Sequence, residues 1–153
     1  MRETIKHGIV TKPTIGFVHL HVHSAYSLRE GALTIEKLYK MAAADHQPAL
    51  AITDTNNLFG ALEFSEKLAK AGIQPIIGIQ LVVDFGDAEV FGRRFDRDHS
   101  GRGNVVLLAA TEQGYANLMK LGSSAFLEPQ AGESAHVLID NLTAHSGGVI
   151  ALT

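Results

Sequence analysis

Three of the chain's eight histidines stand at alternate positions in the run FVHLHVHS, residues 17–24. They are His19, His21 and His23. An extended strand points alternate side chains to one face, with successive members of such a row about 6 to 7 Å apart. Imidazole is the commonest metal ligand in proteins, and two rings on one strand can bind one or two divalent ions when carboxylates complete the coordination. A polar strand face whose rings hydrogen-bond to backbone is the alternative, and the spacing alone does not choose between the two.

Carboxylates that could join these histidines follow in the next elements. Asp54 comes directly after the apolar run ALAIT, residues 49–53, at the strand end where α/β enzymes gather functional groups. Asp54 could be a ligand or a base, but the sequence favours a helix cap there, by Asp54 or Asn57. Glu30 and Glu63 are the nearest other acids, and a surface position is the favoured interpretation for Glu63.

A third polar feature is the stretch RRFDRDHSGRG, residues 93–103. The guanidinium group of arginine can bind two phosphate oxygens at once, yet the interleaved acids favour a solvated, mobile insertion over a phosphate site. The charged residues are Arg93, Arg94, Arg97 and Arg102 with Asp96 and Asp98. The sequence contains no P-loop, no GxGxxG and no serine nucleophile motif.

Apolar periodicity predicts strands that alternate with helices. Helices are expected from a Thr34 cap to about Asp45, over residues 58–71 up to Gly72, and over about 115–126 and 137–145. Strands are expected at residues 17–24, 49–53, 76–83, 104–111 and 149–153. The strands after the first are nearly continuous apolar runs, which indicates parallel βα units and an α/β fold, either part of a barrel or an open doubly wound sheet.

The predicted organisation is a polar leader over residues 1–16 and one domain over residues 17–153. Four or five βα units fall short of the roughly 250 residues of a closed barrel, so we expect the domain to continue beyond residue 153. The formal charge of −3 gives no basic surface for gripping nucleic acid. The absence of cysteine excludes disulfides and thiolate metal sites. With no secretory leader and no apolar run long enough for a bilayer, we expect a cytoplasmic protein without membrane contact.

The motifs resemble a known family. HLHVHSAYSLREG resembles the first motif of PHP (polymerase and histidinol phosphatase) domains. ALAITDTNNLFGALEF and AGIQPIIGIQ are similar to the second and third motifs of this domain in the alpha subunits of bacterial replicative DNA polymerases. VVLLAATEQGYANLMKLGSSAFLE and GGVIALT also resemble that family. The resemblance implies that the βα units form the first part of a PHP-type distorted (βα) barrel.

The resemblance also implies a depleted metal site. Metal-binding PHP domains hold up to three ions with histidines and acids. His21 and His23 match the family's HxH pair, and Glu30 stands where an acidic ligand is expected. Three other expected ligands are replaced, two histidines by Thr55 and Asn104 and an acid by Gln80. We therefore expect no firmly bound cofactor in this segment and at most weak zinc or manganese binding.

In function, the resemblance implies a segment of a DNA-directed DNA polymerase that replicates the chromosome, with no catalytic residue in the segment. Polymerase magnesium and DNA would be held by other domains. The segment would act as a structural platform that docks the proofreading exonuclease subunit, alongside other subunits of the holoenzyme. Two alternatives stay open. One is a metal-dependent PHP phosphoesterase or 3′–5′ exonuclease, and the other is an interaction module without an enzyme parent.

Overall fold

The computed structural model describes residues 16–86 and 101–152. The predicted leader, apart from Gly16, and residues 93–100 of the arginine-rich stretch lie outside these ranges. Helices and strands alternate through most of the described chain. In order they are α1 (Ile35–Ala44), β1 (Ala49–Ile52), α2 (Ala61–Lys70), β2 (Gln74–Asp84), β3 (Arg102–Ala109), α3 (Glu112–Leu127), β4 (Val137–Leu138), α4 (Ile139–Ala144) and β5 (Val149–Leu152).

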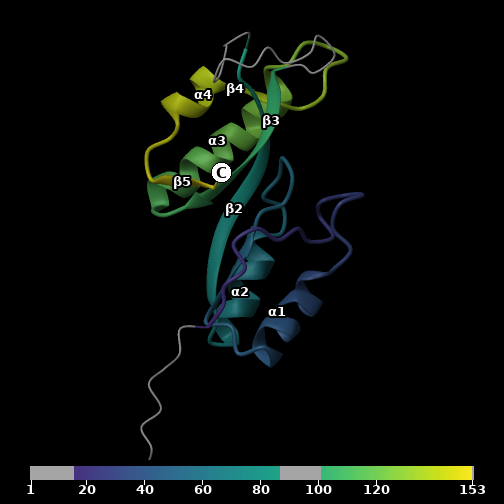
Figure 1. The fold of residues 1–153 in the computed structure, drawn as a ribbon, viewed down its shortest axis with the longest axis vertical. Coiled ribbons are helices and arrows are strands. Elements are labelled where there is room, and N and C mark those ends of the chain that lie inside the picture. The colour runs from purple at the N-terminus through teal and green to yellow at the C-terminus, as the bar shows by residue number, and fades with distance from the viewer. Residues whose placement is uncertain (1–15, 87–100, 153) are drawn as a thin grey trace, which may run out of the picture.

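The long strand β2 connects two halves of the molecule, as Figure 1 shows. Its first residues, Gln74–Ile77, pair in parallel with β1. From Gly78 onward it pairs with β3, and its last two residues also pair with β4. The strand order is β1-β2-β3-β5. A side chain at Gly78 would collide with the backbone oxygen of Leu107, so glycine permits β3 to begin its close approach there.

The expectation of an all-parallel arrangement is wrong for β3, which runs antiparallel to β2 and to β5. The α/β class is confirmed, with a mixed sheet. Asp84 and Arg102 are directly paired at the ends of β2 and β3, and antiparallel neighbours need no crossover helix. Apolar residues such as Leu81 and Leu107 are buried in either direction, so the hydrophobic pattern does not report strand polarity.

The helices begin and end close to the predicted positions. Thr34 caps α1, its side chain accepting a hydrogen bond from the backbone nitrogen of Lys37 at 3.4 Å. Thr111 caps α3 in the same way, with the nitrogen of Gly114 at 3.0 Å. Gly72 follows α2 with φ of 73°, a left-handed conformation that ends helices and suits glycine. None of the described helices has both the length and the apolar character needed to cross a bilayer.

Each half has its own apolar core. The first packs α1 and α2 on β1, with Phe64 and Leu68 fully buried. The second packs α3 on β2 and β3 around Leu118 and Leu121. Burying such a side chain stabilises a fold by about 1.5–3 kcal/mol relative to leaving it exposed. Because β2 contributes to both halves, it holds the loops at the end of β1 in a fixed position beside its own midpoint.

An ion-pair network also joins α1 to α2. Glu36 contacts Lys67 at 2.5 Å across the two helices and Lys40 at 2.9 Å along its own helix. Hydrogen bonds from Lys67 and Lys40 lower the pKa of Glu36 from 4.5 to about 2.

Candidate functional site

The prediction of a strand over residues 17–24, the histidine-bearing segment, is wrong: the segment lies alongside β1 without forming a regular ladder. The backbone nitrogens of Ala51 and Thr53 donate to the oxygens of His19 and Val22, at 2.9 and 2.8 Å. The step of two residues from Ala51 to Thr53, just past the end of β1, thus matches a step of three residues from His19 to Val22, so one extra residue interrupts the alternation of the segment. Thr53 fixes this offset, because its hydroxyl accepts from the nitrogen of Val22 at 3.0 Å and donates to the oxygen of the same residue at 3.2 Å.

Asp54 organises the loop that follows the histidines. Its carboxylate is 2% exposed and accepts hydrogen bonds from the backbone nitrogen of Ser24 at 2.7 Å, the hydroxyl of Ser24 at 2.7 Å and the hydroxyl of Ser27 at 2.6 Å. Ser27 in turn accepts from the backbone nitrogen of Thr55 at 3.0 Å. The favoured prediction of a helix cap is therefore wrong. Helix α2 begins after Gly60 without a side-chain cap, six residues beyond Asp54.

Asn57 is not the cap of α2 either. Its side-chain oxygen accepts from the backbone nitrogen of Phe59 at 3.2 Å, and its side-chain nitrogen donates to the backbone oxygen of Thr55 at 3.0 Å and to that of Tyr26, in the loop after the histidines, at 3.2 Å. Asn57 therefore stabilises the turn ahead of the helix, as asparagine does in many loops.

The rings of His21 and His23 converge beside β2. Their Nε2 atoms lie 3.2 Å apart, and the Nε2 atom of His21 is 2.9 Å from the amide oxygen of Gln80. Gln80 is 6% exposed and belongs to the middle of β2. A residue predicted as a lost acidic ligand thus sits in direct contact with the first residue of the HxH pair.

Glu30 and Thr55 complete this group of side chains. The carboxylate of Glu30 lies 3.3 Å from Nδ1 of His23 and accepts a hydrogen bond from the hydroxyl of Thr55. The hydroxyl of Thr55 also accepts from the side-chain nitrogen of Gln80 at 3.3 Å. Two positions where the family resemblance predicts missing ligands therefore bond to retained ones, Gln80 to His21 and Thr55 to Glu30, and His23 bonds to His21 and Glu30.

The donor set explains what this site can do with a metal. Two tetrahedral zinc ligands with Zn–N bonds of about 2.0–2.1 Å stand roughly 3.3 Å apart, close to the spacing of the two Nε2 atoms. However, the third group near them is a neutral amide, and Glu30 meets the opposite edge of the His23 ring. In the described residues no three histidine, cysteine, aspartate or glutamate side chains are arranged to hold a metal ion. With a neutral amide in place of an anionic ligand beside the two Nε2 atoms, the set as arranged fits a resident divalent ion poorly.

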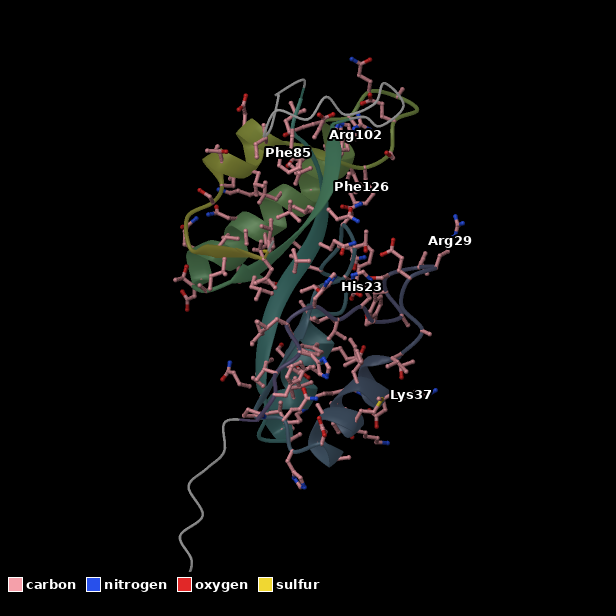
Figure 2. All side chains as sticks on the ribbon, viewed as in Figure 1. His23, Arg29, Lys37, Phe85, Arg102 and Phe126 are labelled. Atoms are coloured by element: carbon pink, nitrogen blue, oxygen red, sulfur yellow. The ribbon has the colours of Figure 1, made fainter. Side chains whose placement is uncertain are left out.

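Other predicted residues stand apart from this group. His19 packs its ring edge against Phe17, with centroids 4.7 Å apart. Asn104 is exposed and pairs with Val82, so it shares a sheet face with Gln80 but is one strand over and two residues along. Glu63 lies on α2 at the surface, as expected, in an ion pair with Lys67 at 3.4 Å. Figure 2 shows Arg29, next to Glu30, pointing away from the molecule while His23 lies close to the ribbon.

A second polar cluster, which the sequence gave no reason to expect, joins the ends of β2 and β3. Arg102 donates to Asp84 at 3.0 Å and to the ring nitrogen Nε2 of His136 at 3.3 Å. His136 is 6% exposed, and its other ring nitrogen bonds to the backbone oxygen of Ser134. The backbone nitrogen of Gly86, at 2.8 Å, and then the Arg102 guanidinium lower the pKa of Asp84. Arg102 is thus a structural cation rather than part of a phosphate site.

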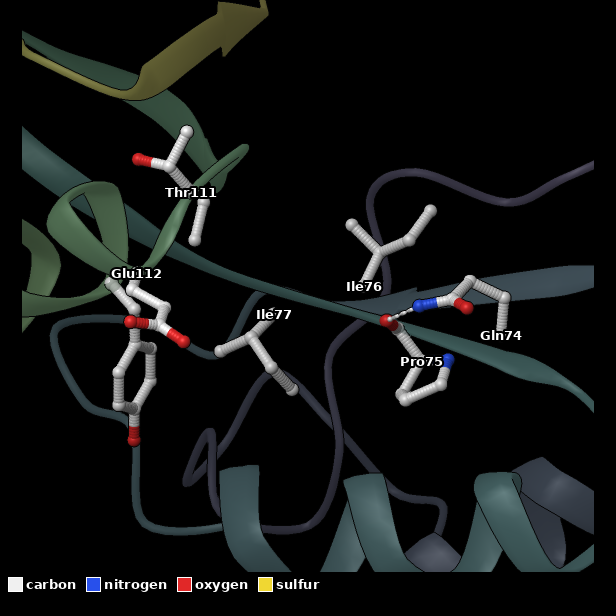
Figure 3. Close-up of a pocket in the computed structure, with 8 residues that line it drawn as sticks. Gln74, Pro75, Ile76, Ile77, Thr111 and Glu112 are labelled. Carbon is white, nitrogen blue, oxygen red and sulfur yellow. Dashed lines mark hydrogen bonds between the residues drawn. The ribbon is translucent and has the colours of Figure 1, made fainter.

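A shallow groove at the start of β2 offers no comparable chemistry. Figure 3 shows its floor of aliphatic side chains from β2, opposite the first turn of α3. Glu112 is its one ionised side chain among the residues that line it, which leaves no pair of groups for acid–base or metal chemistry. The lining residues are Gln74, Pro75, Ile76, Ile77, Ala109, Thr111, Glu112 and Tyr115.

Comparison with known proteins decides the family of this arrangement. A model of the PHP domain matches residues 19–153, which is most of the chain. The chain belongs to the PHP domain family. The resemblance to PHP domains inferred from the motifs is thereby confirmed.

The relatives of this PHP domain include DNA polymerases. The chain is 42% identical over 139 residues to DNA polymerase III subunit alpha of Caulobacter vibrioides, which covers 90% of the chain and 12% of that protein. It is 41% identical over 123 residues to an error-prone DNA polymerase of Symbiobacterium thermophilum, covering 79% of the chain and 10% of that protein. The chain therefore spans about a tenth of the length of the curated relatives it matches.

A solved structure supports the fold of this PHP domain. A candidate metal-dependent phosphoesterase of Bifidobacterium adolescentis superposes with a TM-score of 0.52 at 16% identity, covering 74% of this chain and 34% of that one. At that identity the likeness concerns the fold alone.

Proposed function

We propose that this chain is the PHP segment of the alpha subunit of a bacterial replicative DNA polymerase, acting in the cytoplasm. In this proposal the parent protein extends primers with deoxynucleotides, using magnesium and DNA-binding domains outside the segment. The segment serves as a structural platform that docks the proofreading exonuclease subunit among the other holoenzyme subunits. The relatives named DNA polymerase III subunit alpha, which match across nearly the whole chain, support the parent assignment.

The observation that carries the platform role is the bonding of Gln80 and Thr55 to the retained ligand positions. The amide oxygen of Gln80 lies 2.9 Å from the His21 nitrogen that would bind a metal, and Glu30 is engaged by His23 and Thr55. A PHP hydrolase needs ions to activate water at such a site. Without a fitting donor set, the described residues of this site offer no group that would lower the pKa of a water molecule, so we assign the segment a structural role.

The docking experiment mixes the purified chain with the proofreading exonuclease subunit encoded by the same genome. Size-exclusion chromatography with light scattering should then show a complex with the summed mass of the two chains. Serum albumin in place of the exonuclease is the control and should elute separately. If the exonuclease and the chain elute as separate species at concentrations of tens of micromolar, the platform proposal fails, because docking weaker than that is of little use in a stable holoenzyme.

The alternative function is a metal-dependent phosphoesterase or 3′–5′ exonuclease. One observation favours it, the 3.2 Å approach of the two Nε2 atoms, which matches two ligands of one ion. The assay supplies zinc or manganese with p-nitrophenyl phosphate or with a 3′-labelled DNA strand. We expect no turnover that depends on His21. Hydrolysis lost in His21→Ala and kept in the surface variant His46→Ala would favour the hydrolase over the platform.

A further inference from the structure

Five side chains of the site close into one ring of hydrogen bonds, called the polar ring below. They are His21, His23, Glu30, Thr55 and Gln80. Starting at His21, one arm runs through His23 to Glu30. The other arm runs through Gln80 and Thr55 to the same carboxylate. A closed network in which each member has a partner can be more stabilising than its pairs taken separately.

With the Gln80 amide oriented as in the structure and both rings neutral, donor and acceptor chemistry allows one arrangement of protons in the polar ring. The amide oxygen of Gln80 can only accept, so His21 carries its proton on Nε2. A protonated Nε2 has no lone pair left to accept with, so the facing Nε2 of His23 is the acceptor of a bifurcated hydrogen bond that shares this proton with Gln80, and the proton of a neutral His23 is on Nδ1. There it donates to the carboxylate of Glu30, which can only accept. The two neighbouring histidines therefore have opposite tautomers.

In the second arm the hydrogen bonds also run from donor to acceptor toward Glu30. The side-chain nitrogen of Gln80 donates to the hydroxyl of Thr55, and that hydroxyl donates to Glu30. Both arms thus begin at His21 and end on one carboxylate, so no two donors or two acceptors face each other. The opposite orientation of the Gln80 amide would place its nitrogen against His21 and reverse this order.

The polar ring joins segments that are distant in sequence. His21 and His23 lie on the extended segment beside β1, Glu30 in the loop after it, Thr55 in the turn after β1, and Gln80 in β2. A backbone bridge between Thr55 and Gln80 holds the turn to β2. In it the backbone nitrogen of Gln80 donates to the backbone oxygen of Asp54 at 3.1 Å. The backbone bonds of Glu30 and Gly31 go to Ser27 within the same loop. The side chain of Glu30 therefore links the tip of this loop to Thr55, and through Thr55 to Gln80 in β2.

We propose that the polar ring is a metal-independent clasp that fixes the loop Ser24–Gly31 against β2. It holds together with hydrogen bonds the same segments that a set of bound ions would otherwise cross-link. This proposal rests on the side-chain contacts and not on exonuclease docking, so it stands or falls separately from the platform role.

The first test reads the histidine tautomers in the 153-residue chain by two-dimensional ¹⁵N–¹H correlation of the ring nitrogens. Spectra are recorded with a chelator present at about pH 8.5, well above the ordinary histidine pKa of about 6.5. The clasp predicts a proton on Nε2 of His21 and on Nδ1 of His23. Finding both rings protonated on the same nitrogen, or both exchanging between tautomers, would overturn the clasp.

The second test measures amide hydrogen exchange of Glu30 and Gly31 in variants that open one arm. Thr55→Val and Gln80→Leu should each speed this exchange about fivefold to tenfold, because one net hydrogen bond is lost from the clasp. Thr143→Val on the surface and Gln74→Leu at the start of β2 are matched controls and should leave it unchanged. The reasoning fails if the arm variants match the controls. It also fails if zinc slows this exchange tenfold in the parent and not in His21→Ala, since an ion and not the ring would then hold the loop.

Discussion

Removal of the Asp54 carboxylate should destabilise the domain more than any comparable change at its surface. Three donors within 2.7 Å converge on this side chain, and the serines that supply them are buried, Ser24 at 1% and Ser27 at 2% exposure. Asp54→Ala leaves these donors without an acceptor, at about 1–3 kcal/mol each. Rotation of the two hydroxyls and relief of the buried charge lower the total, so we expect a loss of about 3–5 kcal/mol.

Asp54→Asn gives a graded test of the same contacts. The amide keeps one oxygen for the nitrogen of Ser24 and the hydroxyl of Ser27, but presents a donor to the hydroxyl of Ser24. We expect a loss of about 1–3 kcal/mol. Ser27→Ala combined with Asp54→Asn should be less destabilising than the two single changes added together, with a coupling of about 0.5–3 kcal/mol, because Asp54→Asn weakens a bond from Ser27 that Ser27→Ala already removes.

The assay is urea denaturation followed by far-ultraviolet circular dichroism, with the midpoint and the slope fitted separately. Asp140→Asn, at an exposed position in α4, is the matched control and should stay within about 0.5 kcal/mol of the parent. If Asp54→Ala is no less stable than Asp140→Asn, the assignment of Asp54 as the organiser of the loop is refuted.

Three further predictions concern stability and pH. The pKa of Asp84 is lowered in the folded chain, so its charged form stabilises the fold above its unfolded pKa, near 3.9, and this stabilisation is lost as the pH falls through the lower folded pKa. Asp84→Asn should therefore reduce the fall of the urea midpoint between about pH 5 and 2, and an unchanged fall would contradict this. The pKa of Glu36 is lowered from 4.5 to about 2, so its charged form contributes folding stability that is lost as the pH falls between those two values. Glu36→Gln should reduce this loss of stability in acid, and the difference between the variant and the parent should shrink in about 1 M salt because the group is exposed. Leu121→Ala, in the core of the second half, should lower the unfolding free energy by about 2–5 kcal/mol, and a loss below about 1 kcal/mol would show that this core is poorly packed.

The sequence was informative where local chemistry determines structure. Threonine caps at Thr34 and the left-handed Gly72 follow from side-chain and backbone preferences, and the helices they bound are confirmed. The direction of β3 could not be inferred, because residues such as Leu107 are apolar and buried whichever way the strand runs. Strand polarity depends on the connection and the pairing register, which apolar patterning does not contain.

The site was predictable in its members and not in its geometry. His21, His23, Glu30, Thr55 and Gln80 were all singled out by the resemblance, and the structure brings them together. Which edge of the His23 ring meets Glu30 depends on how the loop is held. The buried serines that hold it gave no signal of their own, since Ser24 and Ser27 look like ordinary loop residues until Asp54 is known to be buried.

The central claim is that this PHP site is held by its own side chains and not by metal. Elemental analysis of the purified chain after exposure to zinc and manganese, followed by desalting, tests it directly, with His21→Ala measured in parallel. The account predicts metal far below one ion per chain and the same content in the variant. Close to one ion per chain in the parent, lost in His21→Ala, would contradict it.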